Sequence, residues 1–230
     1  HGTSRRQRQM CIRDRYLGSR SLPGEPSDKY SKAAKQIIDT GLNCLGTTTT
    51  PEFGLTGTTE SLRFGATCNP WNTAYSTGGS SGGSSALVAS GVIPIAHAND
   101  GAGSIRIPAS CCGLVGLKAS RGRIKDKEVP SYLPANILHD GVVTRSVRDT
   151  WAFHAEIEKN IPATEFPPIG DISESFPKNL KIAVLTENCL GENSSAELVQ
   201  ATHDVARLCE SLGHEAVSYT HLTLPTRSTV

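Results

Sequence analysis

The sequence predicts an α/β protein in which a mixed β-sheet core is flanked by helices. Two stretches carry this prediction. The Gly/Ser-rich run from Gly78 to Ser85 leads directly into a small apolar helical segment and then into a short β-type run. Nearer the carboxyl end, a strand pattern, a helix pattern and a second short apolar run follow one another between residues 180 and 217. Such alternation is typical of α/β units.

The amino-terminal part predicts one helix and little other regular structure. Apolar or small side chains recur at helical spacing from Asp28 to Asp39, with Ser27 available as a cap and Gly41 closing the segment. Asn43 to Gly46 then reads as a brief strand. The polar run from Thr47 to Pro51 reads as a loop or a strand edge.

The middle of the chain predicts a buried helix, a strand and an exposed turn. Ala86 to Ser90 is helix-compatible and ends at Gly91, and Val92 to Ala96 is a short β-type run. Gly101, Gly103 and Ser104 follow that strand. Such a turn can present backbone N–H groups to a ligand.

Two further helices and a strand are predicted towards the carboxyl end. Thr144 to Ile157 has helical spacing with Ser146 as a cap, and Ser195 to Leu212 repeats apolar residues at helical intervals up to Gly213. Leu180 to Leu185 reads as a buried strand.

The two ends of the chain differ in character from what lies between them. Residues 1–15 are basic with almost no apolar periodicity, and residues 218–230 are rich in threonine without an amphipathic pattern. Both resemble translated adapter sequence and are predicted to be non-native or disordered. Residues 16–217 are then the part that folds.

Composition excludes several functional classes. The net charge of +1 is too small to steer the chain towards nucleic acid or an anionic membrane. No apolar run approaches the ~20 residues that span a bilayer. The seven cysteines match no zinc-site spacing and are expected to be free thiols, as in a cytoplasmic protein. Oligomeric state is left open.

The Gly/Ser run allows three interpretations. A phosphate-binding loop would need a following Gly-Lys-Ser/Thr, and the run lacks it. A flexible linker would not be embedded between apolar elements. In the third interpretation, a serine placed among backbone donors carries out nucleophilic acyl transfer.

The third interpretation is supported by a family resemblance. The segment GGSSGGSSALVASGVIPIAHANDGAGSIRIPASCCGLVGLKASRGR, residues 78–123, closely resembles the signature block of the amidase signature family, including the 24-residue separation of Ser80 from Ser104. The wording HANDGAGSIRIPAS is similar to the bacterial branch that includes hydrolases of nylon-oligomer amides (6-aminohexanoate cyclic dimer). The resemblance implies that residues 16–217 form a partial amidase signature domain, an incomplete α/β fold.

The resemblance also implies roles for individual residues. Ser104 would be the nucleophile that becomes acylated, and Ser80 the bridging serine on a cis peptide bond. The N–H groups of Gly101, Ala102, Gly103 and Ser104 would form an oxyanion hole. Three further residues would support the site, namely Ser81 in the hydroxyl network and the bracing ion pair of Asp100 with Arg106.

The expected substrate is a small-molecule carboxamide, cleaved with neither metal nor cofactor. The family relay also needs a lysine, and counting back from Ser80 leads to the neighbourhood of Arg5, inside the foreign segment. A guanidinium stays protonated and cannot accept the serine proton. The expectation is therefore an amidase by family whose truncated chain is itself inactive.

Other readings stay open at this stage. A Ser-His-Asp hydrolase would need His97 or His139 as its base, although Ser104 lacks the G-x-S-x-G context. Cys111 or Cys112 could serve as a nucleophile, although an apolar setting would raise the thiol pKa. The chain could also be a noncatalytic binding or scaffold protein that keeps the fold.

Overall fold

The computed structural model describes residues 17–22, 31–124, 137–160, 166–170, 177–188 and 191–219. The chain forms two compact units, residues 1–173 and 174–230. The predicted foreign segment 1–15 lies outside the described residues, as does the predicted tail 218–230 apart from Ser218 and Tyr219.

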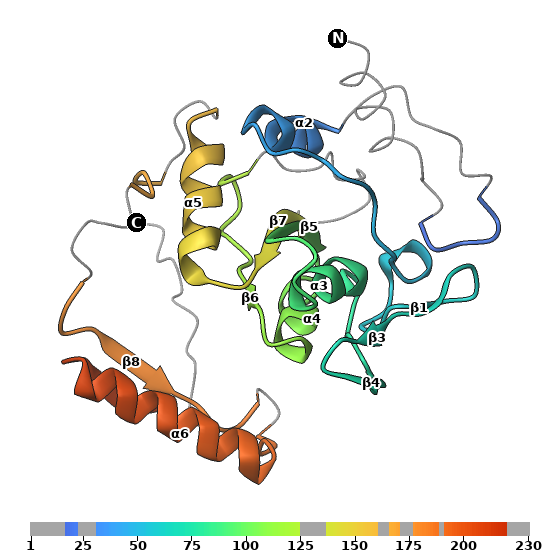
Figure 1. Cartoon of the computed structure of the whole chain (residues 1–230). Coiled ribbons are helices and arrows are strands. Elements are labelled where there is room, and N and C mark those ends of the chain that lie inside the picture. Colours follow the sequence, from blue (N-terminus) through green and yellow to red (C-terminus); the bar gives the residue numbers. More distant parts are fainter. Residues whose placement is uncertain are drawn as a thin grey trace, which may run out of the picture. The chain divides into compact units, whose positions relative to one another are not determined.

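The first unit combines four helices with seven short strands among its described residues (Figure 1). The helices are α2 (Lys32–Asp39), α3 (Gly82–Ala89), α4 (Arg106–Cys111) and α5 (Val147–Glu158), with a 3-10 turn at Glu52–Gly54. The strands are β1 (Glu60–Ser61), β2 (Gly65–Ala66), β3 (Cys68–Asn69), β4 (Asn72–Ser76), β5 (Ile95–Asp100), β6 (Val115–Gly116) and β7 (His139–Thr144). Helices and strands alternate, which confirms the predicted α/β class.

The central sheet has the order β5-β7-β6, and both pairings are antiparallel. Side chains alternate between the two faces of a strand. Accordingly, Ala96 and Val143, which are paired in register, lie on the face covered by α3 and α4. Val142 lies on the opposite face with Phe153 and Ile157 of α5. The central strand β7 is therefore buried between two helical layers, whereas β5 is only partly covered on the α5 side.

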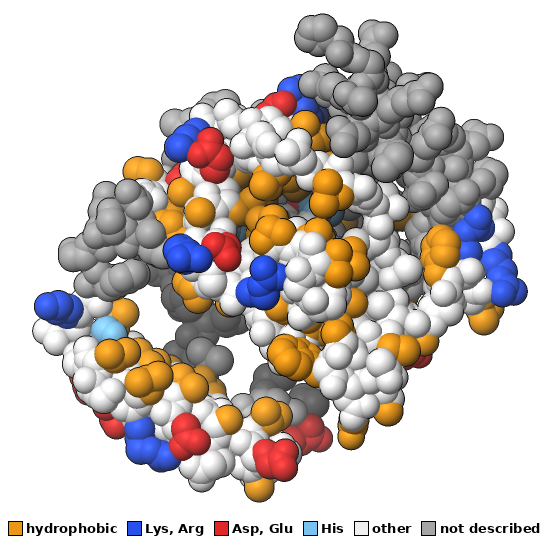
Figure 2. Space-filling view, viewed as in Figure 1, with side chains coloured by type: hydrophobic (Ala, Val, Ile, Leu, Met, Phe, Trp, Pro, Cys, Tyr) orange, Lys and Arg blue, Asp and Glu red, His pale blue; other side chains and the backbone are white. Residues whose placement is uncertain are grey.

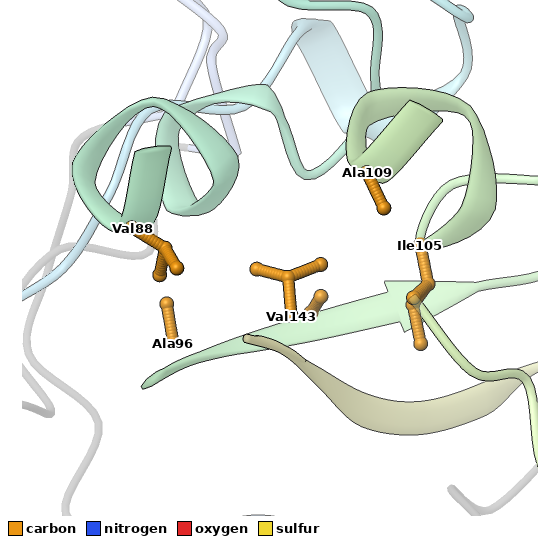
Figure 3. Close-up of a cluster of buried hydrophobic side chains, with 6 residues drawn as sticks. Val88, Ala96, Ile105, Ala109 and Val143 are labelled. Carbon is orange, nitrogen blue, oxygen red and sulfur yellow. The ribbon is translucent and has the colours of Figure 1, made fainter. Parts of the chain in front are cut away.

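Small side chains build the core beside the predicted site. Val88 of α3 and Ala109 of α4 approach Val143 and Ala96 of the sheet, with Ile105 alongside (Figure 3). Ile105 and Val143 have no exposed surface. Burying a side chain of this size contributes about 1.5–3 kcal/mol to folding. This packing fixes the two loops that enter α3 and α4.

The structure describes side-chain caps for two helices of the first unit, α5 and α2. Ser146 caps α5 as predicted, because its Oγ accepts the Asp149 N–H at 3.1 Å. The cap of α2 is Ser31, whose Oγ accepts the Ala34 N–H at 3.1 Å. The predicted start at Asp28 and the predicted cap Ser27 lie outside the described residues, and the helix that the structure describes begins after Ser31.

Three other boundaries differ from the predictions. Residues 43–46 form no strand. Helix α3 begins inside the Gly/Ser run, and β5 begins at Ile95 and extends to Asp100 rather than spanning 92–96. Helix α4 was not predicted, since it contains Pro108. That proline lies in the first turn, where its missing N–H costs no helical hydrogen bond.

The second unit is the predicted strand, helix and strand. Strand β8 (Lys181–Val184) pairs in parallel with β9 (Glu215–Ser218), and α6 (Ala196–Ser211) connects them. The strand predicted as buried alternates between exposed and half-buried residues, because its sheet has only two described strands. Apolar side chains are exposed over this unit, among them Leu198, Val205, Leu208 and Leu212 of α6 (Figure 2).

The cysteines match the prediction only in part. Cys68, Cys111, Cys112 and Cys209 are free. Cys44 is disulfide-bonded, so the expectation of free thiols throughout is wrong at this position, since spacing along the chain does not reveal pairings that the fold creates. Among the described residues, no helix has the length and apolar character needed to cross a bilayer.

His154 is a buried titratable group in the core of the first unit. Its side chain on α5 is 2% exposed, and neither ring nitrogen has a hydrogen-bond partner among the described residues. Burial, aided by the charges of His139 and Arg123 and opposed by Glu158, lowers the pKa of His154 from 6.5 to about 4. The folded chain therefore holds this imidazole neutral.

We predict that the free energy of unfolding rises with pH between about 4 and 6.5. In this window the unfolded chain binds a proton at His154 that the folded chain does not, so stability falls as the pH falls through it. The full effect is about 3 kcal/mol. Urea unfolding across the window should lose most of this slope in His154→Leu and keep it in the control His203→Leu, whose histidine is exposed on α6. An unchanged slope in His154→Leu would contradict the assignment.

Candidate active site

A buried carboxylate organises the turn that carries Ser104. Asp100, the last residue of β5, has no exposed surface. Its Oδ1 accepts the Gly103 N–H at 2.7 Å, and its Oδ2 accepts the Ile105 N–H at 3.2 Å. Arg106, at the start of α4, donates Nε to Oδ2 at 2.9 Å and Nη2 to Oδ1 at 3.1 Å. The ion pair expected between Asp100 and Arg106 thus forms and encloses the turn.

The electrostatics of Asp100 follow from these contacts. Burial by itself raises the carboxyl pKa, but the hydrogen bonds from Arg106, Gly103 and Ile105 outweigh it and lower the pKa to about 2. The Arg106 pKa is in turn raised, first by its hydrogen bond to Asp100. Asp100 is therefore ionised at neutral pH, and it acts on the backbone of the turn.

Ser80 lies in a second tight turn, at the amino-terminal end of α3. The peptide bond between Gly79 and Ser80 is cis, as the family resemblance implied. A methyl group added at Gly54 would lie 3.5 Å from Ser80 Oγ, so the 3-10 turn at residues 52–54 passes directly beside this serine. Ser80 itself is half-buried.

Ser81 joins the two serine-bearing turns. Its N–H donates to the Ser104 carbonyl at 3.3 Å. Its Oγ accepts the Asn99 N–H at 3.2 Å and donates to the Asn99 carbonyl at 3.3 Å, so the side chain takes the place of a neighbouring strand along β5. Ser81, the predicted supporting residue, thereby joins the Ser80 turn to the Ser104 turn. Two serines that are 24 residues apart in the sequence are brought into one site.

The predicted oxyanion donors fall into two groups. The Gly103 N–H donates to Asp100, so in this arrangement it is already used within the protein. No described acceptor bonds the N–H groups of Gly101, Ala102 or Ser104. These three lie on the partly open side of the turn, where Ala102 is exposed and Ser104 is half-buried.

The structure disfavours the phosphate-binding interpretation of the Gly/Ser run. The N–H of Gly82 donates to Thr59 Oγ1 at 3.1 Å, and that of Gly83 donates to the Thr49 carbonyl at 3.3 Å. Because the Ser81 N–H is also bonded, three consecutive donors at the start of α3 are already used by the protein. An anion would have to displace these bonds.

The histidine alternative fails on geometry for His97. His97 lies on β5 with Nε2 2.9 Å from Asp140 Oδ1, a partner that sequence alone did not reveal. Both side chains belong to the face of the sheet that α5 covers, because they alternate with Ala96 and with Val143. Ser104 follows Asp100 on the α4 side. His97 is therefore on the wrong face to be its base. His139 is buried in β7, and among the described residues no hydrogen bond joins it to Ser104.

The cysteine alternative fails on chemistry at Cys112. Burial, with a smaller contribution from Cys111, raises the pKa of the Cys112 thiol to about 11. Its Sγ donates to the Thr77 carbonyl at 3.7 Å. A thiol held protonated in this way is a poor nucleophile at neutral pH.

The described lysines supply no base for Ser80. Lys35 is exposed on α2 and pairs with Asp39 at 2.6 Å, which is a surface ion pair within one helix. No hydrogen bond joins a described lysine to Ser80 or Ser104. The position near Arg5 lies outside the described residues. Within the described part of the chain, no three His, Cys, Asp or Glu side chains are grouped so as to hold a metal ion.

Sequence reasoning missed Thr59 among the residues that shape the site. Its hydroxyl donates to the Gly78 carbonyl at 2.9 Å and accepts the Gly82 N–H, so it contacts both sides of the Ser80 turn. The signal was available in the segment TTTTPEFGLTGTTES, whose threonines are unusually dense. The sequence did not show which of these threonine hydroxyls the fold would bury.

Comparison with known proteins supports one family. The family model described as Amidase matches residues 14–227. The putative amidase AmiC of Mycobacterium tuberculosis is 48% identical over 195 residues, which are 85% of this chain and 41% of that protein. The 6-aminohexanoate-cyclic-dimer hydrolase of Paenarthrobacter ureafaciens is 44% identical, over 84% of this chain and 41% of that protein.

A solved structure agrees. A 6-aminohexanoate cyclic dimer hydrolase complexed with substrate aligns with a TM-score of 0.73 and 38% identity, covering 85% of this chain and 42% of the other. The chain thus spans about 41% of the length of the curated relatives it matches.

We predict that Asp100→Asn destabilises the first unit by about 2–3 kcal/mol, because an amide cannot accept from both the backbone and Arg106. Thermal or urea unfolding at pH 7 measures it, with Asp39→Asn, an exposed pair on α2, as the control of small effect. Because the folded pKa of Asp100 lies below 3.8, its stabilisation is present above that pH and is lost as the pH falls towards 2. Equal effects of the two substitutions would contradict the bracing role.

Proposed function

Because the chain belongs to the amidase signature family, we propose that the complete protein hydrolyses carboxamides through an acyl-enzyme on Ser104. One observation carries the proposal. Ser81 bonds the Ser80 turn to the Ser104 turn, and the N–H groups beside Ser104 have no described acceptor. A nucleophile adjacent to unpaired backbone donors is the arrangement that acyl transfer requires.

In the proposed reaction, Ser104 Oγ attacks the amide carbon while its proton passes to Ser80 Oγ, and the Ser80 proton passes to a lysine. The carbonyl oxygen becomes an oxyanion that accepts from the N–H groups of Gly101, Ala102 and Ser104. Each such donor is worth roughly 3–4 kcal/mol in the transition state. The C–N bond then breaks, the amine leaves with the relayed proton, and water hydrolyses the ester on Ser104 by the reverse relay.

Asp100 and Arg106 have a structural role in this scheme. Asp100 holds the Gly103 N–H, and this contact orients the neighbouring peptide groups without contacting substrate. Ala102 occupies a donor position and contributes only its backbone, so its methyl group removes no hydrogen bond. The scheme needs no metal and no cofactor. Its partner is a small-molecule amide, and a cytoplasmic location remains a prediction.

In our proposal, this chain does not supply the lysine of the relay. Its expected position is near Arg5, and a guanidinium cannot take the Ser80 proton. Removing the base from residues that act as a unit removes most of the rate. We therefore propose that the 230-residue chain has negligible turnover, whereas the same chain with a family upstream segment is active.

We predict that a serine-directed fluorophosphonate labels Ser104 only in a chain whose residues 1–15 are replaced by the corresponding segment of AmiC. Mass spectrometry of both chains identifies the labelled residue. Ser104→Ala should abolish labelling, and Ser110→Ala, which removes an exposed serine on α4, should retain it.

The other outcomes separate the alternatives. If neither chain is labelled, the noncatalytic binding or scaffold reading is favoured. If both chains are labelled, the base lies elsewhere in the chain. Robust amide turnover by the 230-residue chain that Ser104→Ala abolishes would overturn the claim of inactivity.

A further inference from the structure

One buried hydroxyl spans the turn that carries Ser80. Thr59 is 1% exposed, and it follows the exposed segment at residues 55–58. Its Oγ1 donates to the carbonyl of Gly78, one residue before the cis peptide bond, at 2.9 Å. The same oxygen accepts the N–H of Gly82, two residues beyond Ser80, at 3.1 Å. A single side chain thus fixes both sides of the turn.

We propose that Thr59 is a positioning residue that holds Ser80 in place against Ser104 for proton transfer. The inference rests on the proposed function for its catalytic consequence, while the restraint on the turn is independent of that function. Thr59 contacts neither reacting serine in the described structure, so it acts through the backbone of the Ser80 turn.

The contact requires a hydroxyl at this position. Only a group that donates and accepts through one oxygen can serve the Gly78 carbonyl and the Gly82 N–H together. Valine has nearly the same shape but neither function, and it would leave the Gly82 N–H buried without an acceptor. Gly82 itself has no room for a side chain, because a Cβ there would collide with the hydroxyls of Thr59 and Thr77.

The neighbouring threonine does not duplicate the restraint. Thr77 Oγ1 lies 3.1 Å from the Gly78 carbonyl oxygen and 3.2 Å from that of Thr67, and its one proton can be donated to either, but the Gly82 N–H donates to Thr59. Loss of Thr59 therefore leaves the entry to the turn partly held and removes the bond of the Gly82 N–H at its exit into α3. Ser81, which lies between Ser80 and Gly82, stays bonded to Asn99 and Ser104. Thr59 and Ser81 together hold Ser80 between two fixed points.

Proton transfer between two hydroxyls tolerates only small displacements of their oxygen atoms. A relay needs its oxygens within about 2.6–3.2 Å of each other, and a misplacement of about 1 Å can cost about 100-fold in rate. Release of the Gly82 end would let Ser80 move by such amounts without unfolding the sheet, whose packing involves Val88, Ala96 and Val143 instead.

The first arm of the test measures the restraint in the 230-residue chain by amide hydrogen exchange in NMR. Thr59→Val should speed exchange at the Gly82 N–H by about tenfold, because its acceptor is lost. Thr59→Ser, which keeps the hydroxyl, should exchange as the parent does. Thr73→Val, which changes an exposed threonine on β4, is the matched control and should leave Gly82 unaffected. Unchanged exchange in Thr59→Val would overturn the proposal.

The second arm measures chemistry in the chain that carries the AmiC upstream segment. Thr59→Val should slow acylation of Ser104 by about 100-fold and lower kcat with KM little changed, and Thr59→Ser should restore both. A merely structural role would lower the folded fraction without this split. Thr59→Val acylated as fast as the parent would overturn the positioning role. If the parent is not acylated at all, the proposed function fails, and the exchange arm alone decides the restraint.

Discussion

The site depends first on the buried carboxylate of Asp100. A charge without exposed surface is stable only when its hydrogen bonds replace the lost water. Here the replacements are backbone N–H groups of the turn itself and the guanidinium of Arg106, so satisfying the charge and shaping the turn are the same event. The conformation that stabilises Asp100 leaves the N–H groups of Gly101, Ala102 and Ser104 without acceptors. The same hydrogen bonds to Asp100 therefore shape the turn and leave three of its N–H groups able to bind an anion.

A second constraint is the close approach of backbones beside this turn. Ser81 and Ser84 of the Gly/Ser run bond to Asn99 and to the His97 carbonyl, where β5 would otherwise present an unpaired edge. Such contacts need short side chains, which the Gly and Ser residues of this run provide. Gly-rich sequence here marks tight packing and not flexibility.

The sequence predicted most elements, and the structure brings the serines and the ion pair of the predicted site together, but the sequence did not predict all of the bonding among them. The spacing of 144–157 predicted α5 and its Ser146 cap because local signals decide a solvent-facing helix. Helix α3 starts earlier than predicted, because tertiary contacts of Gly82 and Gly83 override the poor helix propensity of glycine. The competition of Asp100 for the Gly103 N–H could not be predicted, since a motif gives residue types and not which donor meets which acceptor.

Among the described residues, the hydrogen bonds that hold the Ser80 and Ser104 turns come from residues 49–106. The arrangement of the two serines is therefore separable from the source of the base, since a proton acceptor supplied from elsewhere would meet turns that are already formed. The two serine turns are formed although no described lysine is bonded to Ser80. A similarity of these turns to the family is therefore evidence for family membership and not, by itself, for activity. In the proposed relay, activity depends on whether a lysine reaches Ser80, and the restraint that we propose for Thr59 keeps that serine in place for it.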